Sequence, residues 1–190
     1  MNKLQNYKFR NQNVEIRARK VEDYQVYVAG YNMQKPSQRK YDQGYTDMSF
    51  ATKDWYIEKL KEWELLAQSD VVYLFGIFRI SDGCMVGYCD LTTFHREDYQ
   101  IGMVGYVIFN PYWNNGYAKE AVAAMIYLGF NELGYHRLEA HINLDNDISK
   151  KVVQSSGFRF ESIREKYCIE NEVWNDFEVY TITNPKDHKR

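Results

Sequence analysis

Apolar and polar residues alternate over several short segments, a pattern typical of β-strands with one buried face. The first such segment is 14–20 (VEIRARK), and two others are 71–80 and 84–94. Between these two, Ser-Asp-Gly at 81–83 is typical of a hairpin turn. A further strand is predicted over 100–109 (QIGMVGYVIF), which is apolar on both faces at its end and should therefore be central in a sheet.

Apolar residues recur with helical spacing in four segments, 21–33, 52–68, 117–133 and 147–156. Thr52 is well placed as the N-cap of the second helix. Gly134 and Gly157 follow the third and fourth helices, where glycine commonly ends a helix. Helices and strands thus interleave along the chain.

The remainder of the chain predicts a strand over 136–143 and a final hairpin of 158–170 and 173–183, turning around Asn171. The segment 34–50 is the longest irregular stretch. The order β-α-α-β-β-β-α-β-α-β-β mixes hairpins with βαβ steps. This order predicts an α/β protein with a mixed sheet.

Composition narrows the functional classes. The chain has 190 residues, of which 45% are hydrophobic, with a net charge of −2. These values favour one globular domain and give no electrostatic argument for binding nucleic acid or a membrane. No segment approaches the roughly 18 apolar residues of a membrane span, and the N-terminus lacks a signal-peptide core. Three cysteines without framework spacing favour free thiols in a reducing compartment, so we expect a cytoplasmic protein.

The segment 110–121 (NPYWNNGYAKEA) joins the central strand to an alanine-rich helix. A helix N-terminus presents unpaired N–H groups and partial positive charge, and phosphate oxygens match both. Gly116 and Ala118 leave room for close approach, and Asn114 and Asn115 tolerate unusual backbone angles and add donors. Taken alone, the segment fits either a pyrophosphate cradle or an ordinary βα turn. Neither GxxxxGK[ST] nor a GxGxxG after a strand is present.

A second segment, 144–160 (LDNDISKKVVQSSGFRF), places Asn146 before a short helix and Ser149 one turn later, and Gly157-Phe158 closes the helix. Together, the two segments resemble the GNAT superfamily of N-acetyltransferases, and most of all its branch of Rim-type ribosomal-protein N-terminal acetyltransferases. The resemblance covers about residues 10–184. It implies one GNAT domain, a mixed sheet of about six to seven strands, and about four flanking helices.

The resemblance also implies acetyl-coenzyme A (acetyl-CoA) as cosubstrate, because the first segment corresponds to the family pattern [Q/R]xxGx[G/A] that binds its pyrophosphate. Trp113 stands where that pattern has Gln or Arg, and tryptophan is common at this position in the Rim branch. Asn114 and Asn115 replace its usual glycine and basic residue. The implied cofactor-binding residues are Tyr106, Val107, Ile108, Trp113, Asn114, Asn115, Gly116, Tyr117, Ala118, Lys119, Asn146 and Ser149.

In the family, pantetheine lies between diverging strands four and five. Backbone groups of Tyr106, Val107 and Ile108 would hold it, with an N–H near Val107 steadying the oxyanion. The alternative is that this strand is only part of the core. Many relatives use a tyrosine acid at the position that is Val153 here. Ser149 is then a candidate proton donor to the thiol, although it could instead only cap its helix.

Glu139 is a candidate base, since alternation along the strand puts it on one face with Arg137 and His141. The alternative, which the sequence favours, is a surface pairing of Glu139 with Arg137. Glu161 and Asp90 are further candidates, and some relatives use no dedicated base. No metal is expected, because His136 and His141 are an odd number of residues apart, as are Cys84 and Cys89.

In the family, the acceptor binds between the first two helices and the late hairpin, here 31–48 and 169–177. The hairpin carboxylates Glu170, Glu172, Asp176 and Glu178 could attract a cationic amine or could only be solvated. The resemblance predicts direct acetyl transfer to a primary amine, either a protein N-terminus or a small molecule. The alternative is a non-catalytic protein that binds or senses acyl-CoA. Monomer and homodimer both remain open.

Overall fold

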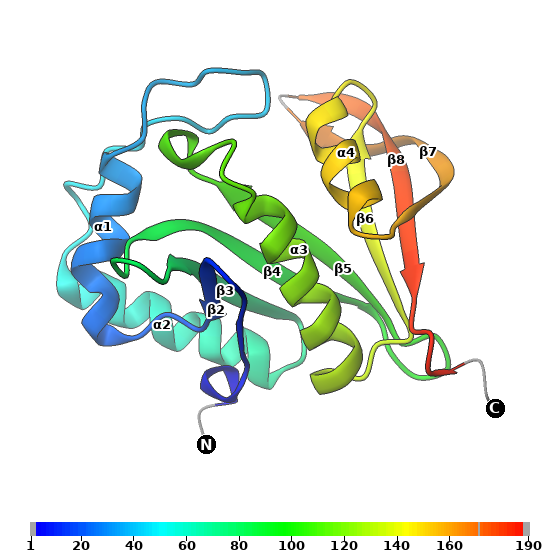
Figure 1. The fold of residues 1–190 in the computed structure, drawn as a ribbon, viewed down its shortest axis with the longest axis horizontal. Helices are drawn as coiled ribbons and strands as arrows, with labels where there is room; N and C mark the ends of the chain where they lie inside the picture. Colours follow the sequence, from blue (N-terminus) through cyan, green and yellow to red (C-terminus); the bar gives the residue numbers. More distant parts are fainter. Residues whose placement is uncertain (1–2, 171, 188–190) are drawn as a thin grey trace.

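The computed structural model describes residues 3–170 and 172–187. Its strands are β1 (Lys8–Arg10), β2 (Val14–Arg17), β3 (Val72–Arg79), β4 (Met85–His95), β5 (Ile101–Ile108), β6 (Arg137–Asn143), β7 (Arg159–Glu170) and β8 (Val173–Thr183). They form one sheet in the order β1-β2-β3-β4-β5-β6-β8-β7 (Figure 1). All neighbours are antiparallel except β5 and β6.

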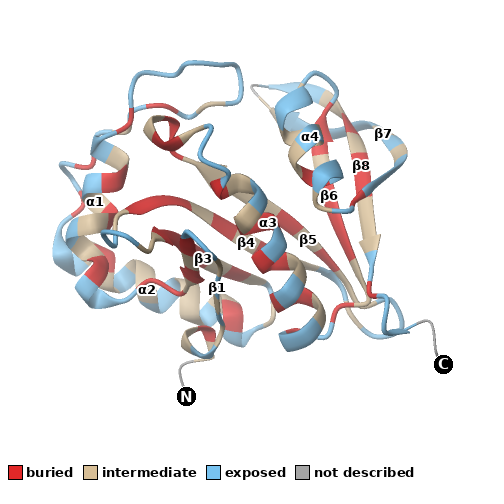
Figure 2. Cartoon of the chain, in the orientation of Figure 1, coloured by how far each residue is buried: buried red, intermediate tan, exposed pale blue. Residues whose placement is uncertain are grey.

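The α-helices are α1 (Tyr24–Asn32), α2 (Lys53–Gln68), α3 (Tyr117–Tyr127) and α4 (Asp147–Ser155). They pack on two faces of the sheet. Tyr88 of β4 stacks on Tyr31 of α1, and its partner Val107 on β5 shares that face. The next residue, Tyr106, points to the opposite face and contacts Ser149 of α4. Buried residues follow the strands and the inner helix surfaces (Figure 2).

The predicted α/β class and mixed sheet are confirmed, with eight strands rather than six to seven. The strand that the sequence pattern missed is β1, three residues long and at the sheet edge. The strand predicted over 14–20 ends at Arg17. The helix predicted over 117–133 is α-helical to Tyr127 and then widens into a π-helical turn, Leu128–Glu132. The turn predicted around Asn171 lies outside the described residues.

Local signals in the sequence are confirmed where a single contact decides the conformation. Thr52 caps α2, accepting a 3.2 Å hydrogen bond from the backbone N–H of Trp55. Gly134 and Gly157 both have positive φ just past their helices, a conformation that glycine adopts without strain. The three cysteines are free, as predicted.

The sheet opens between β5 and β6. The two strands pair only from Ile101 with Arg137 to Met103 with Glu139, although each continues for four or five further residues. Beyond this point they diverge, with α3 following β5 and α4 following β6 (Figure 1). The edge of β5 from Val104 onward is therefore not paired with β6. We call the wedge between these two diverging strands the cleft. Within the described residues, no helix is long and apolar enough to cross a membrane.

Candidate functional site

The turn from β5 to α3 forms one lip of the cleft. Gly116 is the N-cap of α3 with φ of +80°, and a Cβ added there would meet no atom within 4 Å. Asn114 also has positive φ. No side chain caps α3, in contrast to α2, capped by Thr52, and α4, capped by Asn146. Within the described residues, no side chain therefore accepts from the first N–H groups of α3, as a phosphate-binding helix end requires.

Two side chains in this turn, those of Trp113 and Asn115, hold its shape through hydrogen bonds to the backbone. The indole N–H of Trp113 donates to the Ile108 carbonyl over 2.7 Å. The amide of Asn115 donates to the carbonyls of Tyr112 and Trp113 at 3.1 and 2.9 Å. The sequence had suggested Asn115 as an extra donor to phosphate, but these two bonds use its amide hydrogens within the turn. The outward donors here are therefore the backbone N–H groups and the amide of Asn114, which is exposed and forms no hydrogen bond to the described residues.

Three further positions of the predicted cradle lie at the start of α3. Tyr117 is buried in the core, Ala118 is half-buried and Lys119 is exposed. Only backbone groups of Tyr117 are therefore available to a ligand, whereas Lys119 offers a cation beside the helix end. Along β5, the residues Tyr106, Val107 and Ile108 are half-buried at the unpaired edge of the strand. The carbonyl of Ile108 is already occupied by Trp113.

The opposite wall of the cleft is the first turn of α4. Asn146 caps this helix, since its side-chain oxygen accepts from the Ser149 N–H at 3.3 Å. The hydroxyl of Ser149 is therefore not the cap, and it lies 2.9 Å from the hydroxyl of Tyr106. Burial raises the pKa of Tyr106 and outweighs the hydrogen bond to Ser149, which lowers it. This contact was not foreseen, because the sequence assigned only the backbone of Tyr106 a role.

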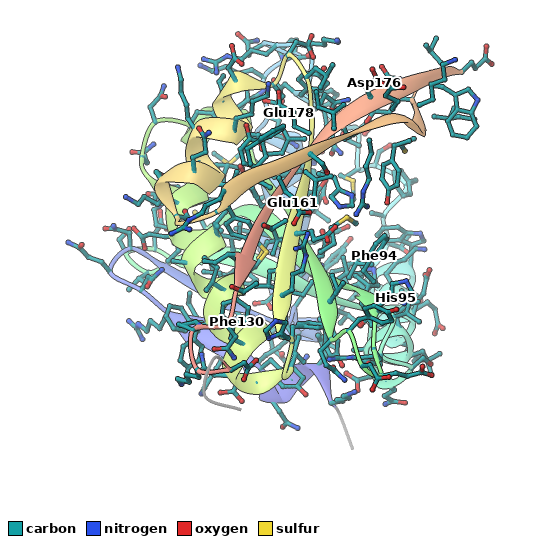
Figure 3. All side chains as sticks on the ribbon, turned by 90° about the vertical axis from the view of Figure 1, so that its right-hand side faces the viewer. Phe94, His95, Phe130, Glu161, Asp176 and Glu178 are labelled. Atoms are coloured by element: carbon teal, nitrogen blue, oxygen red, sulfur yellow. The ribbon has the colours of Figure 1, made fainter. Side chains whose placement is uncertain are left out.

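Glu139 lies at the closed end of the cleft, on the sheet face opposite α4. It belongs to a charged cluster, defined as Arg137, Glu139, His141, Glu161 and Arg164, which Phe94 and Tyr167 border (Figure 3 labels Glu161 and Phe94). The predicted pairing with Arg137 is confirmed at 2.9 Å. The predicted surface position of this pair is wrong, because Glu139 is only 2% exposed.

The charged cluster keeps Glu139 ionised. Burial alone would raise its pKa, but hydrogen bonds from His141 and Arg137 and the charges of Arg137 and Arg164 together lower it to about 2. A carboxylate with so low a pKa accepts a proton poorly at neutral pH. Its neighbour Glu161 also binds Arg137 and has a lowered pKa, chiefly through that hydrogen bond.

Asp90 is in a different environment. It lies on β4, where it pairs with Gly105 of β5, and its carboxylate accepts one hydrogen bond from Thr92 at 3.1 Å. Burial raises its pKa, and the Thr92 bond and the charge of Arg19 only partly oppose this. The signal in the sequence was weak: a lone aspartate in an apolar strand, opposite a glycine.

The irregular segment 34–50 bridges the two walls at the open end of the cleft. The Lys40 ammonium and the Tyr41 hydroxyl both bind Asp145, the residue before the cap of α4. The guanidinium of Arg39 lies 4.8 Å from the Trp113 ring centre on the other lip. In Figure 1 this segment arches from α1 over the end of the sheet. We call residues 34–50 the bridging loop.

Buried Asn110 fastens the bridging loop to the end of β5. Its side chain accepts from the Lys35 N–H at 2.8 Å and donates to the Lys35 carbonyl and to Asp42, each at 2.9 Å. Gln43 of the same loop accepts a hydrogen bond from the Tyr88 hydroxyl at 3.0 Å. Asn110 was not predicted as a site residue. An asparagine directly before Pro111, at the end of an apolar strand, was its only signal.

Most carboxylates of the late hairpin form hydrogen bonds or ion pairs with other residues of the protein. Glu178 pairs with Lys150 at 2.6 Å, and Glu170 accepts from Asn143 at 2.7 Å. Asp176 accepts from the backbone N–H of Lys166 at 2.8 Å. Figure 3 labels Asp176 and Glu178, which both lie on β8. Only Glu172, which is exposed, has no such contact among the described residues. These carboxylates therefore do not converge on one cation site.

The histidines also have separate partners. His136 lies 3.0 Å from Asp187, and His141 lies 2.7 Å from Glu139. Among residues 3–170 and 172–187, no group of three or more His, Cys, Asp or Glu residues is arranged to hold a metal ion.

The sequence matches the acetyltransferase (GNAT) domain family over residues 13–159. It is 33% identical over 132 residues to the probable N-acetyltransferase YjcK of Bacillus subtilis (strain 168), which covers 70% of this chain and 73% of YjcK. Among solved structures it resembles the ribosomal-protein-S5-alanine acetyltransferase from Vibrio fischeri, with a TM-score of 0.73, 22% identity, and coverage of 94% of this chain and 97% of that chain.

It also resembles RimJ from Mycobacterium smegmatis, solved in complex with CoA-disulfide, with a TM-score of 0.73, 19% identity, and coverage of 93% of this chain and 84% of that chain. Rim-type ribosomal-protein acetyltransferases are thus among the structural neighbours of this protein. At these identities, the likeness to the two structures concerns the fold.

Proposed function

The chain belongs to the acetyltransferase (GNAT) domain family, and we propose that it moves an acetyl group from acetyl-CoA to a primary amine by direct transfer. In this proposal, residues 10–184 act as one acetyltransferase domain. The observation that carries it is the cleft between β5 and β6, which has an uncapped helix N-terminus at one lip and a hydroxyl pair inside.

Acetyl-CoA fits this cleft by its shape and chemistry. The pyrophosphate would lie against the N–H groups at Gly116, Tyr117 and Ala118, where the space that a Cβ would fill is open. The pantetheine arm, which carries amides, would pair with the free backbone edge of β5 near Tyr106 and Val107, much as an added strand does. Solved RimJ, a structural neighbour, contains a CoA derivative, which agrees with this use of the fold.

The chemistry requires a neutral amine close to the thioester carbonyl, donors for the oxyanion and a proton for the thiolate. A backbone N–H near Val107 would stabilise the oxyanion. The hydroxyl pair of Tyr106 and Ser149 would protonate the leaving thiolate, because it places a hydroxyl proton inside the cleft. The raised pKa of Tyr106 means that its hydroxyl still carries that proton at neutral pH. This pair takes the role of the tyrosine that many relatives carry at the position of Val153.

The acceptor would approach from the α1 side, between the bridging loop and the late hairpin. Tyr31 and Tyr88 stack with ring centres 6.4 Å apart beside this approach, and the Tyr88 hydroxyl binds Gln43 of the bridging loop. Aromatic walls of this kind accommodate either an extended peptide end or a small-molecule amine. The name of the Vibrio fischeri neighbour refers to an alanine of a ribosomal protein, which makes peptide N-termini the first acceptors to examine.

The experiment is to measure free thiol released from acetyl-CoA in the presence of a panel of amines: peptides with Ala or Ser N-termini, polyamines and aminoglycosides. Thiol release that depends on one class of amine supports the transferase. Binding of acetyl-CoA with no turnover on any amine would contradict it and favour the alternative, a non-catalytic acyl-CoA-binding protein of the same fold.

A further inference from the structure

The carboxylate of Asp90 lies directly over the backbone of β5 at the apex of the cleft. Asp90 pairs with Gly105, and a Cβ on residue 105 would lie only 2.5 Å from Asp90 Oδ1. Only glycine leaves room for the carboxylate in this position. Gly105 is the second residue past Met103, where the pairing of β5 with β6 ends. The carboxylate is therefore close to the stretch of β5 that the thioester would follow.

Asp90 is poorly satisfied for a carboxylate in the interior. Its one hydrogen bond from a side chain comes from Thr92, and no Lys, Arg or His of the described residues forms an ion pair with it. The residue is half-buried rather than sealed, so part of its surface is accessible. A buried carboxylate without a paired cation favours its protonated form, which is the property of a base that must hold a proton.

The groups that surround Asp90 are few. Its partner residues across the sheet, Leu74 on β3 and Gly105 on β5, carry no charge. On β4, its neighbours are Tyr88 and Cys89, both of which have raised pKa values because they are buried, and so stay neutral.

The nearby charge that acts on Asp90 is Arg19, from the segment between β2 and α1. It lowers the Asp90 pKa without reversing the rise caused by burial. Its guanidinium is stacked 3.9 Å from the centre of the Trp63 ring on α2 and makes no ion pair in the described residues. On the same sheet face, Glu139 and His141 of β6 are bound to each other.

Comparison with Glu139 distinguishes the two carboxylates. Glu139 receives hydrogen bonds from Arg137, His141 and Arg164 and therefore holds its negative charge firmly. Asp90 faces one hydroxyl and an open backbone edge. Of two carboxylates near the divergence of the strands, one is thus built to stay ionised and the other to exchange a proton.

We propose that Asp90 is the general base that takes a proton from the acceptor amine, an inference that rests on the proposed acetyl transfer. The acceptor arrives as an ammonium ion and gives one proton to the Asp90 carboxylate, which later loses it to water. The neutral nitrogen then forms the C–N bond to the thioester carbon and the C–S bond breaks. The thiolate takes a proton from the Tyr106–Ser149 pair, and the second proton lost by nitrogen restores that pair through water.

The test compares two acceptors of one shape: an alkyl amine, protonated at neutral pH, and a hydroxylamine-type or aromatic amine that is already neutral there because its pKa lies below about 7. For Asp90→Asn we expect a loss of kcat on the order of 100-fold with the alkyl amine and less than about 5-fold with the neutral amine. The shift in unfolding temperature caused by acetyl-CoA should equal that of wild type.

A second variant tests the role of Asp90 without removing its carboxylate. Gly105→Ala places a methyl group against Asp90 Oδ1 and displaces it, so it should show the same dependence on the acceptor. Equal losses with both acceptors in folded variants, or no loss in either variant, would overturn the assignment of Asp90. If wild type itself turns over no amine, then the proposed function fails, and the role of Asp90 fails with it. If wild type is active and Asp90→Asn is equally active, then the role of Asp90 as base is wrong, while the proposed acetyl transfer still stands.

Discussion

The hydroxyl of Tyr106 on β5 lies 2.9 Å from the hydroxyl of Ser149 on α4, so the two walls of the cleft are joined by one hydrogen bond. The position one turn further along α4, Val153, is fully buried and carries no proton donor. In the proposed transfer, the proton for the thiol therefore comes from a hydroxyl pair that α4 and the facing strand β5 share. A comparison of the residues at matching positions of α4 does not reveal that this pair would replace the tyrosine of many relatives.

Replacing either hydroxyl should slow acetyl transfer. We expect Tyr106→Phe and Ser149→Ala each to lower kcat on the order of 10- to 100-fold, with little change in KM for acetyl-CoA, because the proton is needed only as the thiol leaves. Since the two groups act as one pair, the double variant should be no slower than the slower single variant. Steady-state kinetics of the three variants measure this. Losses that multiply in the double variant would show that the two hydroxyls act independently.

A carboxylate at Gly116 should weaken acetyl-CoA binding by repelling the pyrophosphate. The matched control is Gly116→Asn, which has the same size and tolerates the positive φ of this position. We expect Gly116→Asp to bind at least about 10-fold more weakly than Gly116→Asn, a difference of about 1.4 kcal/mol. Calorimetric titration with acetyl-CoA gives both dissociation constants. Equal affinities of the two folded variants would remove the pyrophosphate from this turn.

Glu139 should stabilise the fold in a pH-dependent manner. Its pKa falls from 4.5 to about 2 on folding, so its contribution is complete above about pH 5 and is lost as the pH falls through that interval. The shift corresponds to about 3 kcal/mol. Glu139→Gln should therefore be less stable than wild type at pH 7, by on the order of 3 kcal/mol, and the difference should shrink towards pH 3. Chemical denaturation at several pH values measures it.

Glu161→Gln is the control for that prediction. It removes an exposed carboxylate bound to the same Arg137, so we expect a loss below about 1 kcal/mol. A pH-independent difference between Glu139→Gln and wild type would contradict the low pKa of Glu139.

Asn110→Ala should release the bridging loop. It removes the partners of the Lys35 N–H and carbonyl and of Asp42, which should cost about 1–3 kcal/mol of stability. Amide hydrogen exchange should become faster in residues 34–50 and remain unchanged in β3 and β4. KM for the amine acceptor should rise more than KM for acetyl-CoA. Unchanged exchange in the loop would mean that its other contacts suffice to hold it.

Periodic features of the sequence predicted most of the framework, because the pattern of each helix and long strand reflects the face that it buries. The edge strand β1 was missed because three residues carry too little pattern to reveal a strand. The π-helical turn at Leu128–Glu132 was also missed, because its register depends on tertiary packing rather than on local preference.

The candidate site was predictable at Gly116, where the sequence indicated room for close approach and the structure leaves open the space that a Cβ would fill. It was not predictable where function depends on partners distant in sequence. Tyr106 and Ser149 are 43 residues apart. The surroundings of Glu139 and Asp90 also differ. Glu139 binds Arg137 of its own strand and Arg164 of β7, whereas Asp90 forms no ion pair among the described residues. The pattern of β6 indicated the Arg137 pairing, but no local pattern indicates the contact with Arg164 or the burial of either carboxylate.

The most direct measurement of the central claim is the unfolding temperature of the wild-type protein with and without acetyl-CoA. At about 100 times the dissociation constant, binding should stabilise the fold by about 2.7 kcal/mol, which corresponds to an increase of roughly 5–10 °C for a domain of this size. An increase of this size is the predicted result. An unchanged unfolding temperature at millimolar acetyl-CoA would contradict a cosubstrate site between β5 and β6.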